Sequence, residues 1–373
     1  MRQPKSIKTL GLGLVGILFA PLLGCTFTPE CDTVPQNVQD PVGMATLPTN
    51  GNLLVSSGDL AVQYCGGQVV TVDATSNAVA SRIETRLGDE TSGRRHLLGE
   101  IATNADGTRA FVTERTADRL LVIDLASGSI QTEIALEEDP FAVAFNAATT
   151  HVLVSNLGSG SISIVDASSL SVVATITLVE GELGSRPAGI ALSRDGARAF
   201  VTDQLSNFIH VIDLNSLTEV DTDASADGTN PIEIETGSTA INSRGIAVSP
   251  IDGVNEAYLG NRDPDSVVVI DTANLRVVDL IALPSSCDNP DGIVAVASGE
   301  IFVACSETDE VAVLDRATRE LEREITVGDN PQAMAISPNG QRVYVGNLND
   351  DSISVIDNDP ASGTRFTVIA TIP

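Results

Sequence analysis

Two kinds of polar residue recur beside short β-branched segments of this 373-residue chain, and together they could bind a ligand. Arginines come just before such segments, at Arg95, Arg186 and Arg244. Acidic or amide residues end other segments, at Glu114, Asn156, Asp203, Asn261 and Asn347. Guanidinium groups bind anions, and ligand sites form where several polar groups converge. The set therefore predicts binding of an anionic or polar ligand, or of a partner's loop. The alternative is that the amides and acids hold turns while the arginines pair with neighbouring acids.

The sequence contains no common catalytic or cofactor motif. His-Glu-x-x-His, Cys-x-x-Cys-His, Gly-x-Ser-x-Gly and the phosphate-binding loop are all missing, so we predict no catalytic residue, no metal ligand and no cofactor. Asp223–Gly228 matches the first half of a calcium loop, but Ile234 stands where a bidentate Glu should close it. We therefore favour a solvated insertion over a Ca²⁺ site. His210 is predicted to be an ordinary strand residue.

These polar residues sit in a pattern that repeats along the chain. A β-branched run that ends in aspartate recurs at intervals of 42 to 58 residues, at Asp73, Asp124, Asp166, Asp213, Asp271, Asp315 and Asp357. This spacing is typical of a four-stranded propeller blade. Each carboxylate can accept a backbone N–H two residues further on, so we expect the aspartates to nucleate turns rather than to do chemistry.

Each repeat contains four short runs separated by turn residues, which is the pattern of an antiparallel meander. The first run of most repeats holds a small residue at the same place: Gly43, Ala142, Gly189, Gly245, Gly292 and Ala333. Small residues suit the crowded inner strands around a central channel. The exception is Glu100, which adds an acid to the predicted channel mouth. The sequence therefore predicts an all-β, seven-bladed β-propeller of four-stranded antiparallel blades over residues 41–373, closed by packing rather than by strand exchange.

The ends of the second runs carry a family resemblance. Phe111-Val112-Thr113-Glu114, Leu153-Val154-Ser155-Asn156, Phe200-Val201-Thr202-Asp203, Tyr258-Leu259-Gly260-Asn261 and Tyr344-Val345-Gly346-Asn347 all follow one template. The chain thus resembles the YVTN (YncE-like) family of β-propeller repeats, which implies the same fold over about residues 41–373. A WD40 propeller is not expected, because the chain has no tryptophan.

The first 24 residues read as an export signal. Arg2, Lys5 and Lys8 precede an apolar run from Leu10 to Leu23, which is too short and wrongly flanked for a spanning helix. The run ends in Leu22-Leu23-Gly24-Cys25, which resembles a bacterial lipobox and implies a lipid on Cys25. We expect a signal peptide at 1–24, a lipidated tether at 25–40 and an extracytoplasmic protein anchored to the cell envelope, in the outer membrane if the cell has two.

The four remaining cysteines predict two disulfides in an exported chain. Cys31 and Cys65 fall on one face within the first repeat, and Cys287 and Cys305 fall likewise within the sixth. The propeller register therefore predicts bridges Cys31–Cys65 and Cys287–Cys305.

Composition narrows the possible partners. Beyond residue 24 the chain has 18 basic residues, all arginine, against 50 acidic ones, a formal net charge of −32. Such a surface repels nucleic acid and anionic lipid, so membrane contact is expected through the anchor only.

We therefore predict a monomeric, non-catalytic binding module that presents its propeller to an envelope protein or glycan. The alternative is a metal-dependent hydrolase resembling the propeller lactonases, in which Glu100, Asn156 and Asp203 could imitate the metal-binding set.

Overall fold

A computed structural model describes residues 37–58, 67–85, 97–179, 184–223, 228–234 and 244–373. Alternating β-branched runs and turns form strands in which adjacent elements pair antiparallel. The first two blades contain β1 (Pro41–Thr46), β2 (Leu53–Ser57), β3 (Gln68–Asp73), β4 (Ala78–Glu84), β5 (Leu98–Thr103), β6 (Arg109–Glu114), β7 (Arg119–Asp124) and β8 (Ser129–Ala135). The third contains β9 (Pro140–Asn146), β10 (His151–Asn156), β11 (Ser161–Asp166) and β12 (Ser171–Thr177).

The fourth blade has an interrupted outer strand. It contains β13 (Pro187–Leu192), β14 (Arg198–Asp203), β15 (Phe208–Asp213), β16 (Thr218–Glu219) and β17 (Ile232–Glu233). Both β16 and β17 pair with β15, because the insertion that the long spacing before Asp271 indicated divides the outer strand in two.

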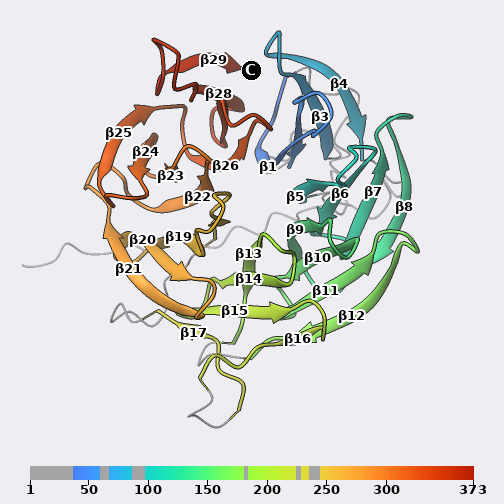
Figure 1. Cartoon of the computed structure of the whole chain (residues 1–373). Coiled ribbons are helices and arrows are strands. Elements are labelled where there is room, and N and C mark those ends of the chain that lie inside the picture. Colours follow the sequence, from blue (N-terminus) through green and yellow to red (C-terminus); the bar gives the residue numbers. More distant parts are fainter. Residues whose placement is uncertain (1–36, 59–66, 86–96, 180–183, 224–227, 235–243) are drawn as a thin grey trace, which may run out of the picture. The chain divides into compact units, whose positions relative to one another are not determined.

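The last three blades return to four strands each. They contain β18 (Ile246–Val248), β19 (Glu256–Arg262), β20 (Asp265–Asp271), β21 (Arg276–Ala282), β22 (Pro290–Ala295), β23 (Glu300–Cys305), β24 (Glu310–Asp315), β25 (Leu321–Thr326), β26 (Pro331–Ile336), β27 (Arg342–Asn347), β28 (Ser352–Asp357) and β29 (Val368–Ile372). The predicted seven-bladed β-propeller is confirmed (Figure 1). No helix in the described part of the chain is long and apolar enough to span a membrane.

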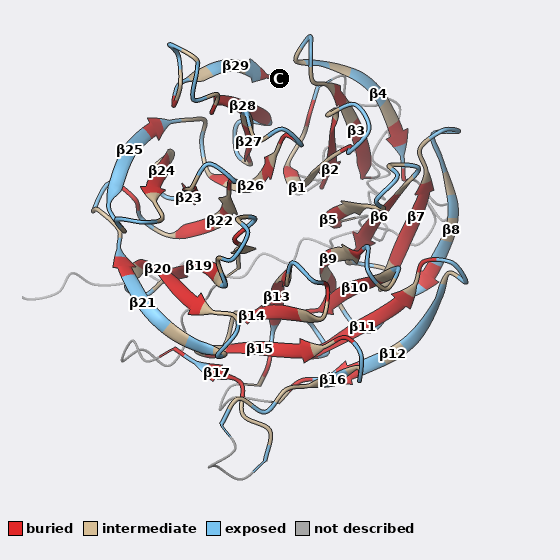
Figure 2. Cartoon of the chain, viewed as in Figure 1, coloured by how far each residue is buried: buried red, intermediate tan, exposed pale blue. Residues whose placement is uncertain are grey.

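The apolar core is divided among the contacts between blades. Each cluster of buried side chains joins two neighbouring blades, as Phe111 of β6 and Val154 of β10 do in one of them. Third strands such as β7, β11 and β15 are buried, whereas outer strands such as β8 and β12 are exposed (Figure 2). Stability therefore comes largely from nearest-neighbour packing, as expected for a ring of repeats.

The ring closes by packing between the last and first blades. Tyr344 and Ile372 of the seventh blade share a core cluster with Leu53 and Val70 of the first. All four strands of the seventh blade come from the C-terminal repeat, as predicted. The backbone N–H of Val38 also donates to Pro373 O at 3.2 Å, which ties the segment before β1 to the end of the chain.

The recurring aspartates hold turns, as predicted. The Oδ1 of Asp166 accepts the backbone N–H groups of Ser168 and Ser169 at 2.9 and 2.6 Å, and Asp213 does the same with Asn215 and Ser216 at 2.9 Å each. Backbone N–H groups two or three residues on also donate to Asp73, Asp124, Asp271, Asp315 and Asp357.

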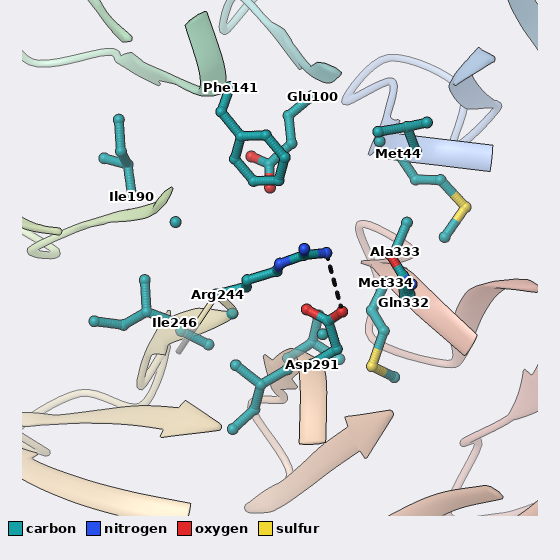
Figure 3. A pocket seen from close by; sticks show the side chains of 18 of the residues that line it. Met44, Glu100, Phe141, Ile190, Arg244, Ile246, Asp291, Gln332, Ala333 and Met334 are labelled. Carbon is teal, nitrogen blue, oxygen red and sulfur yellow. Dashed lines mark ion pairs between the residues drawn. The ribbon is translucent and has the colours of Figure 1, made fainter. Parts of the chain in front are cut away.

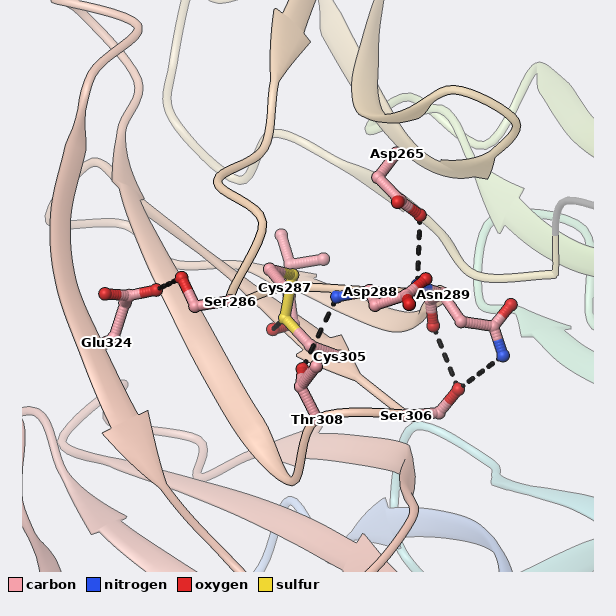
Figure 4. Close-up of a disulfide and its surroundings, with 10 residues drawn as sticks. Asp265, Ser286, Cys287, Asp288, Asn289, Cys305, Ser306, Thr308 and Glu324 are labelled. Carbon is pink, nitrogen blue, oxygen red and sulfur yellow. Dashed lines mark hydrogen bonds between the residues drawn. A yellow bond between two sulfur atoms is a disulfide. The ribbon is translucent and has the colours of Figure 1, made fainter.

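One predicted disulfide lies in the described part of the chain (Figure 4). Cys287, just before β22, is bonded to Cys305, the last residue of β23, with a Cα–Cα distance of 4.8 Å. Both residues are buried. The bridge joins two segments of the sixth blade, as the sequence pattern predicted. Cys25, Cys31 and Cys65 lie outside the described residues.

Candidate functional site

A cavity of about 600 Å³ lies at the centre of the ring, where all the innermost strands meet. Each blade contributes to its wall: Val42, Glu100, Phe141, Gly189, Arg244, Asp291 and Gln332. Figure 3 shows Arg244 extending into this space, with Glu100 on one side and Asp291 on the other. Ligand sites in proteins are typically such concave spaces with a few convergent polar groups, so this cavity is the candidate site.

The strand register divides the wall into levels. Pro41, Pro187, Pro290 and Pro331 each face the last residue of the neighbouring strand, and this places the next three residues of each inner strand at equivalent heights. At the first level stand Val42, Gly99, Phe141, Ala188, Arg244, Asp291 and Gln332. The third level is formed by Met44, Ile101, Val143, Ile190, Ile246, Ile293 and Met334. Charged groups therefore occur at the first two levels, and the third is entirely apolar.

Small residues dominate the second level because neighbouring inner strands touch through their backbones. A Cβ added to Gly189 would lie 2.0 Å from Arg244 O, and one added to Gly292 would lie 1.9 Å from Gln332 O. In the second blade the glycine stands at the first level and the larger residue, Glu100, at the second. Its close contact is made by Gly99, whose added Cβ would lie 2.6 Å from Phe141 O, and this leaves Glu100 to occupy the cavity wall.

A buried ion pair forms one side of the cavity. The Nη2 of Arg262, from the end of β19, lies 2.6 Å from Asp291 Oδ2, and the two side chains are 11% and 6% exposed. Burial raises the pKa of the Asp291 carboxyl, while the charges of Arg262 and Arg244 act in the opposite direction. Asp291 is thus already engaged by Arg262.

Arg244 is bound more loosely. Its Nη1 lies 3.6 Å from Asp291 Oδ2, which is an ion pair but too long for a hydrogen bond. No hydrogen bond joins its guanidinium to any described residue, and its buried Nε has no partner there. The side chain is 34% exposed. Arg244 therefore presents a fixed positive charge with free donors to the cavity.

Glu100 has no close partner of opposite charge among the described residues. Its carboxylate accepts a hydrogen bond from the backbone N–H of Val143, and no described basic side chain lies within 4.0 Å of it. Burial raises the pKa of Glu100 to about 7, and the negative charge of Asp291 acts in the same direction. The glutamate can therefore gain or lose a proton near neutral pH.

Two of the nine sequence-predicted binding residues, Glu100 and Arg244, line the cavity. Arg186 is exposed and lies outside the cavity lining. Arg95 lies outside the described residues. The remaining five predicted positions are the residues that end second strands.

Those five do not line the cavity, which corrects the expectation that they reach the channel mouth. Glu114, Asn156, Asp203, Asn261 and Asn347 are all fully buried. Their side chains bond to partners within their own blades.

The amides hold these turns. The Nδ2 of Asn156 donates to Ser161 and Ser163 Oγ at 3.0 and 2.9 Å, and Asn347 does the same with Ser352 and Ser354 at 3.0 Å. Asn261 donates to Ser266 Oγ at 3.0 Å. For these residues the structural alternative is correct.

The two acids at the same position are paired inside their blades. Arg119 Nε lies 3.0 Å from Glu114 Oε2. His210 lies within β15, as predicted, and its ring nitrogens lie 3.3 Å from Asp203 Oδ2 and 2.6 Å from Glu219 Oε1. Burial lowers the pKa of His210, but hydrogen bonds to Asp203 and Glu219 outweigh it and the net shift is upward. All three side chains are buried and contribute no group to the cavity.

The set proposed for a lactonase-like metal site is not brought together. Glu100 lines the cavity, while Asn156 and Asp203 are buried in the third and fourth blades. Among the described residues there is no group of three or more His, Cys, Asp and Glu side chains that could hold a metal ion. Of the calcium-loop echo, residues 224–227 lie outside the described part.

Sequence reasoning missed Phe141, Asp291, Gln332 and Arg262. A signal for the first three was present, because each directly precedes a small inner-strand residue, as Arg244 does. Arg262 had no such signal, since it follows Asn261 and meets Asp291 only through the packing of the fifth blade against the sixth.

Comparison with known proteins gives a partial sequence match and a likeness in fold. No family model matches the chain. It is 32% identical over 136 residues to the uncharacterized proteins YncE of Salmonella typhimurium and of Escherichia coli K12, and the match covers 36% of this chain and 36% of each relative. The chain is thus matched over about a third of the length of these relatives.

A solved structure extends the likeness in fold to nearly the whole chain. A chain of Kuenenia stuttgartiensis hydrazine synthase superposes with a TM-score of 0.71 and 16% identity, over 90% of this chain and 99% of that one. At this identity the likeness concerns the fold alone. The seven four-stranded blades show that the chain is a β-propeller, and over 136 residues it is similar to the YncE proteins.

Proposed function

We propose that this protein is a cell-envelope lipoprotein whose propeller is a non-catalytic binding module, and that its ligand enters the central cavity and is held by Arg244. The observation that carries the proposal is the state of this arginine. Its guanidinium lines the cavity, lies 3.6 Å from a carboxylate that Arg262 already engages, and makes no hydrogen bond to a described residue. An anionic or polar ligand would supply the missing acceptors.

The envelope location rests on the N-terminal sequence. A basic head, an apolar run and Leu22-Leu23-Gly24-Cys25 support export and lipid attachment. Mass spectrometry of the mature N-terminus tests this part of the proposal: a diacylglyceryl group on Cys25 is expected, and an unmodified cysteine or cleavage elsewhere would contradict it. Cys25→Ser should release the protein from membranes.

The binding role is tested with small molecules extracted from the cell envelope. Wild-type protein, Arg244→Ala and Arg186→Ala are each incubated with the extract, separated from unbound compounds and analysed by mass spectrometry. We expect compounds to be retained by the wild type and by Arg186→Ala, because Arg186 lies outside the cavity. Arg244→Ala should lose at least nine-tenths of the retained material. Equal retention by all three proteins would overturn the cavity as the binding site.

A further inference from the structure

The cavity can lose negative charge by taking up a proton, but it cannot lose its positive charge. Arg244 and Arg262 carry guanidinium groups, which stay protonated in proteins. Glu100, in contrast, has no close basic partner among the described residues, so its charge can be removed by taking up a proton. A cation that enters the cavity meets the positive charge of Arg244, which cannot be removed. An anion meets the negative charge of Glu100, which can.

The surroundings of Glu100 make protonation easy. Besides Arg244, the other charged groups of the cavity wall are Asp291, which is engaged by Arg262, and Arg115, which is engaged by Asp139 at 2.7 Å. Burial already brings the pKa of Glu100 to about 7. An anion beside it would raise that pKa further, because a second negative charge disfavours the ionised form.

The apolar level determines the rest of the ligand. Met44, Ile101, Ile190, Ile246, Ile293 and Met334 line the cavity. They lie one to two residues along the inner strands from the charged level, so a molecule held at Arg244 can extend into contact with them. Each methylene buried there would tighten binding by roughly fourfold.

We propose, resting on the proposed function above, that the ligand is an amphiphilic carboxylate, with its carboxylate on the guanidinium of Arg244 and its hydrocarbon chain against the apolar level. Binding is accompanied by uptake of one proton from the buffer onto a carboxylate oxygen of Glu100. The protonated group then donates a hydrogen bond to the ligand, and no covalent bond forms or breaks.

The probes are octanoate, octylamine and octanol, which share a chain and differ in head group, with acetate as the short control. Affinities are measured by isothermal titration calorimetry on the mature protein at pH 6.0 and pH 8.5. We expect octanoate to bind at least tenfold more tightly than octylamine, octanol and acetate at pH 6.0. From pH 6.0 to pH 8.5 the affinity for octanoate should fall by about tenfold or more. At pH 8.5 Glu100 is ionised before octanoate binds, so binding must also drive the uptake of a proton.

Two variants separate the roles of the charged groups. Arg244→Ala should weaken octanoate binding at least tenfold at both pH values. Glu100→Gln should leave binding at pH 6.0 within about threefold and remove most of its pH dependence, because the amide imitates the protonated acid.

The outcomes distinguish this inference from the proposed function. Preferential binding of octylamine or octanol would overturn the inference and leave the cavity as a ligand site. Failure of all four probes to bind, with envelope compounds still lost in Arg244→Ala, would overturn the inference alone. Octanoate binding that is unchanged in Arg244→Ala would overturn the inference, and unchanged retention of envelope compounds would overturn the proposed function.

Discussion

Folding lowers the pKa of the acidic residues at the turns and raises the pKa of those in the cavity. In six of the seven recurring turn aspartates the largest effect is a hydrogen bond donated within the turn, which lowers the pKa. In Asp357 burial opposes this, and hydrogen bonds from Ser362 and Thr364 outweigh it. In Glu100 and Asp291 burial dominates and raises the pKa.

This difference separates structure from binding. A carboxylate surrounded by backbone donors is fixed in one protonation state and fastens the chain. A carboxylate that a cavity buries with few donors remains able to respond to what enters. Abundance of acid in the sequence therefore says little about function until the hydrogen-bond donors around each group are known.

The largest effect is expected from breaking the buried pair at the cavity. Arg262→Met removes the 2.6 Å partner of Asp291 and leaves a buried carboxylate, which should lower the free energy of unfolding by about 3–5 kcal/mol. Urea denaturation measures this. Arg276→Met, at an exposed arginine of β21, is the control and should change little. An equal effect of the two variants would show that the pair at Asp291 is not buried in solution.

A smaller effect is expected from removing one turn aspartate. Asp213→Ala deletes the acceptor of two backbone N–H groups and should lower Tm by about 1–3 °C. Asp213→Asn keeps an acceptor oxygen and should cost less. Because the pKa of Asp213 is lowered by folding, its contribution is complete above the unfolded pKa and is lost as the pH falls through the folded pKa. Differential scanning calorimetry at pH 7 and pH 3 should therefore show a smaller penalty at pH 3, and a larger one there would contradict the turn role.

Glu100 should behave in the opposite way. Between about pH 4.5 and pH 7 the unfolded chain releases the proton of the Glu100 carboxyl, whereas the folded protein keeps it because its pKa is raised. Raising the pH through this range therefore destabilises the fold. Glu100→Gln should raise Tm by about 1–2 °C at pH 8.5 and leave it almost unchanged at pH 5.0. Glu137→Gln, at an exposed position, is the control for removal of a charge. A gain that is the same at both pH values would contradict the assignment.

The sequence predicted the features that recur in every repeat, but not the side-chain contacts that form between one repeat and the next. The blades, the turn aspartates and the Cys287–Cys305 bridge follow from local patterns that recur in register. Glu100 and Arg244 were found because each departs from its own repeat or from the acidic background. Asn156 and Asn347 were misplaced because the direction of a side chain at a strand end depends on the turn beneath it. The pairing of Arg262 with Asp291 joins two blades, and no pattern within either repeat predicts it.

The protonation of Glu100 tests the account most directly. Carboxyl ¹³C resonances of the wild type and of Glu100→Gln, recorded from pH 4 to pH 9, isolate the signal of this one residue by difference. We predict a midpoint of about 7 in the free protein, which moves upward when octanoate is added. A midpoint near 4.5 that octanoate does not move would show that the cavity neither buries this carboxyl nor couples it to a bound anion.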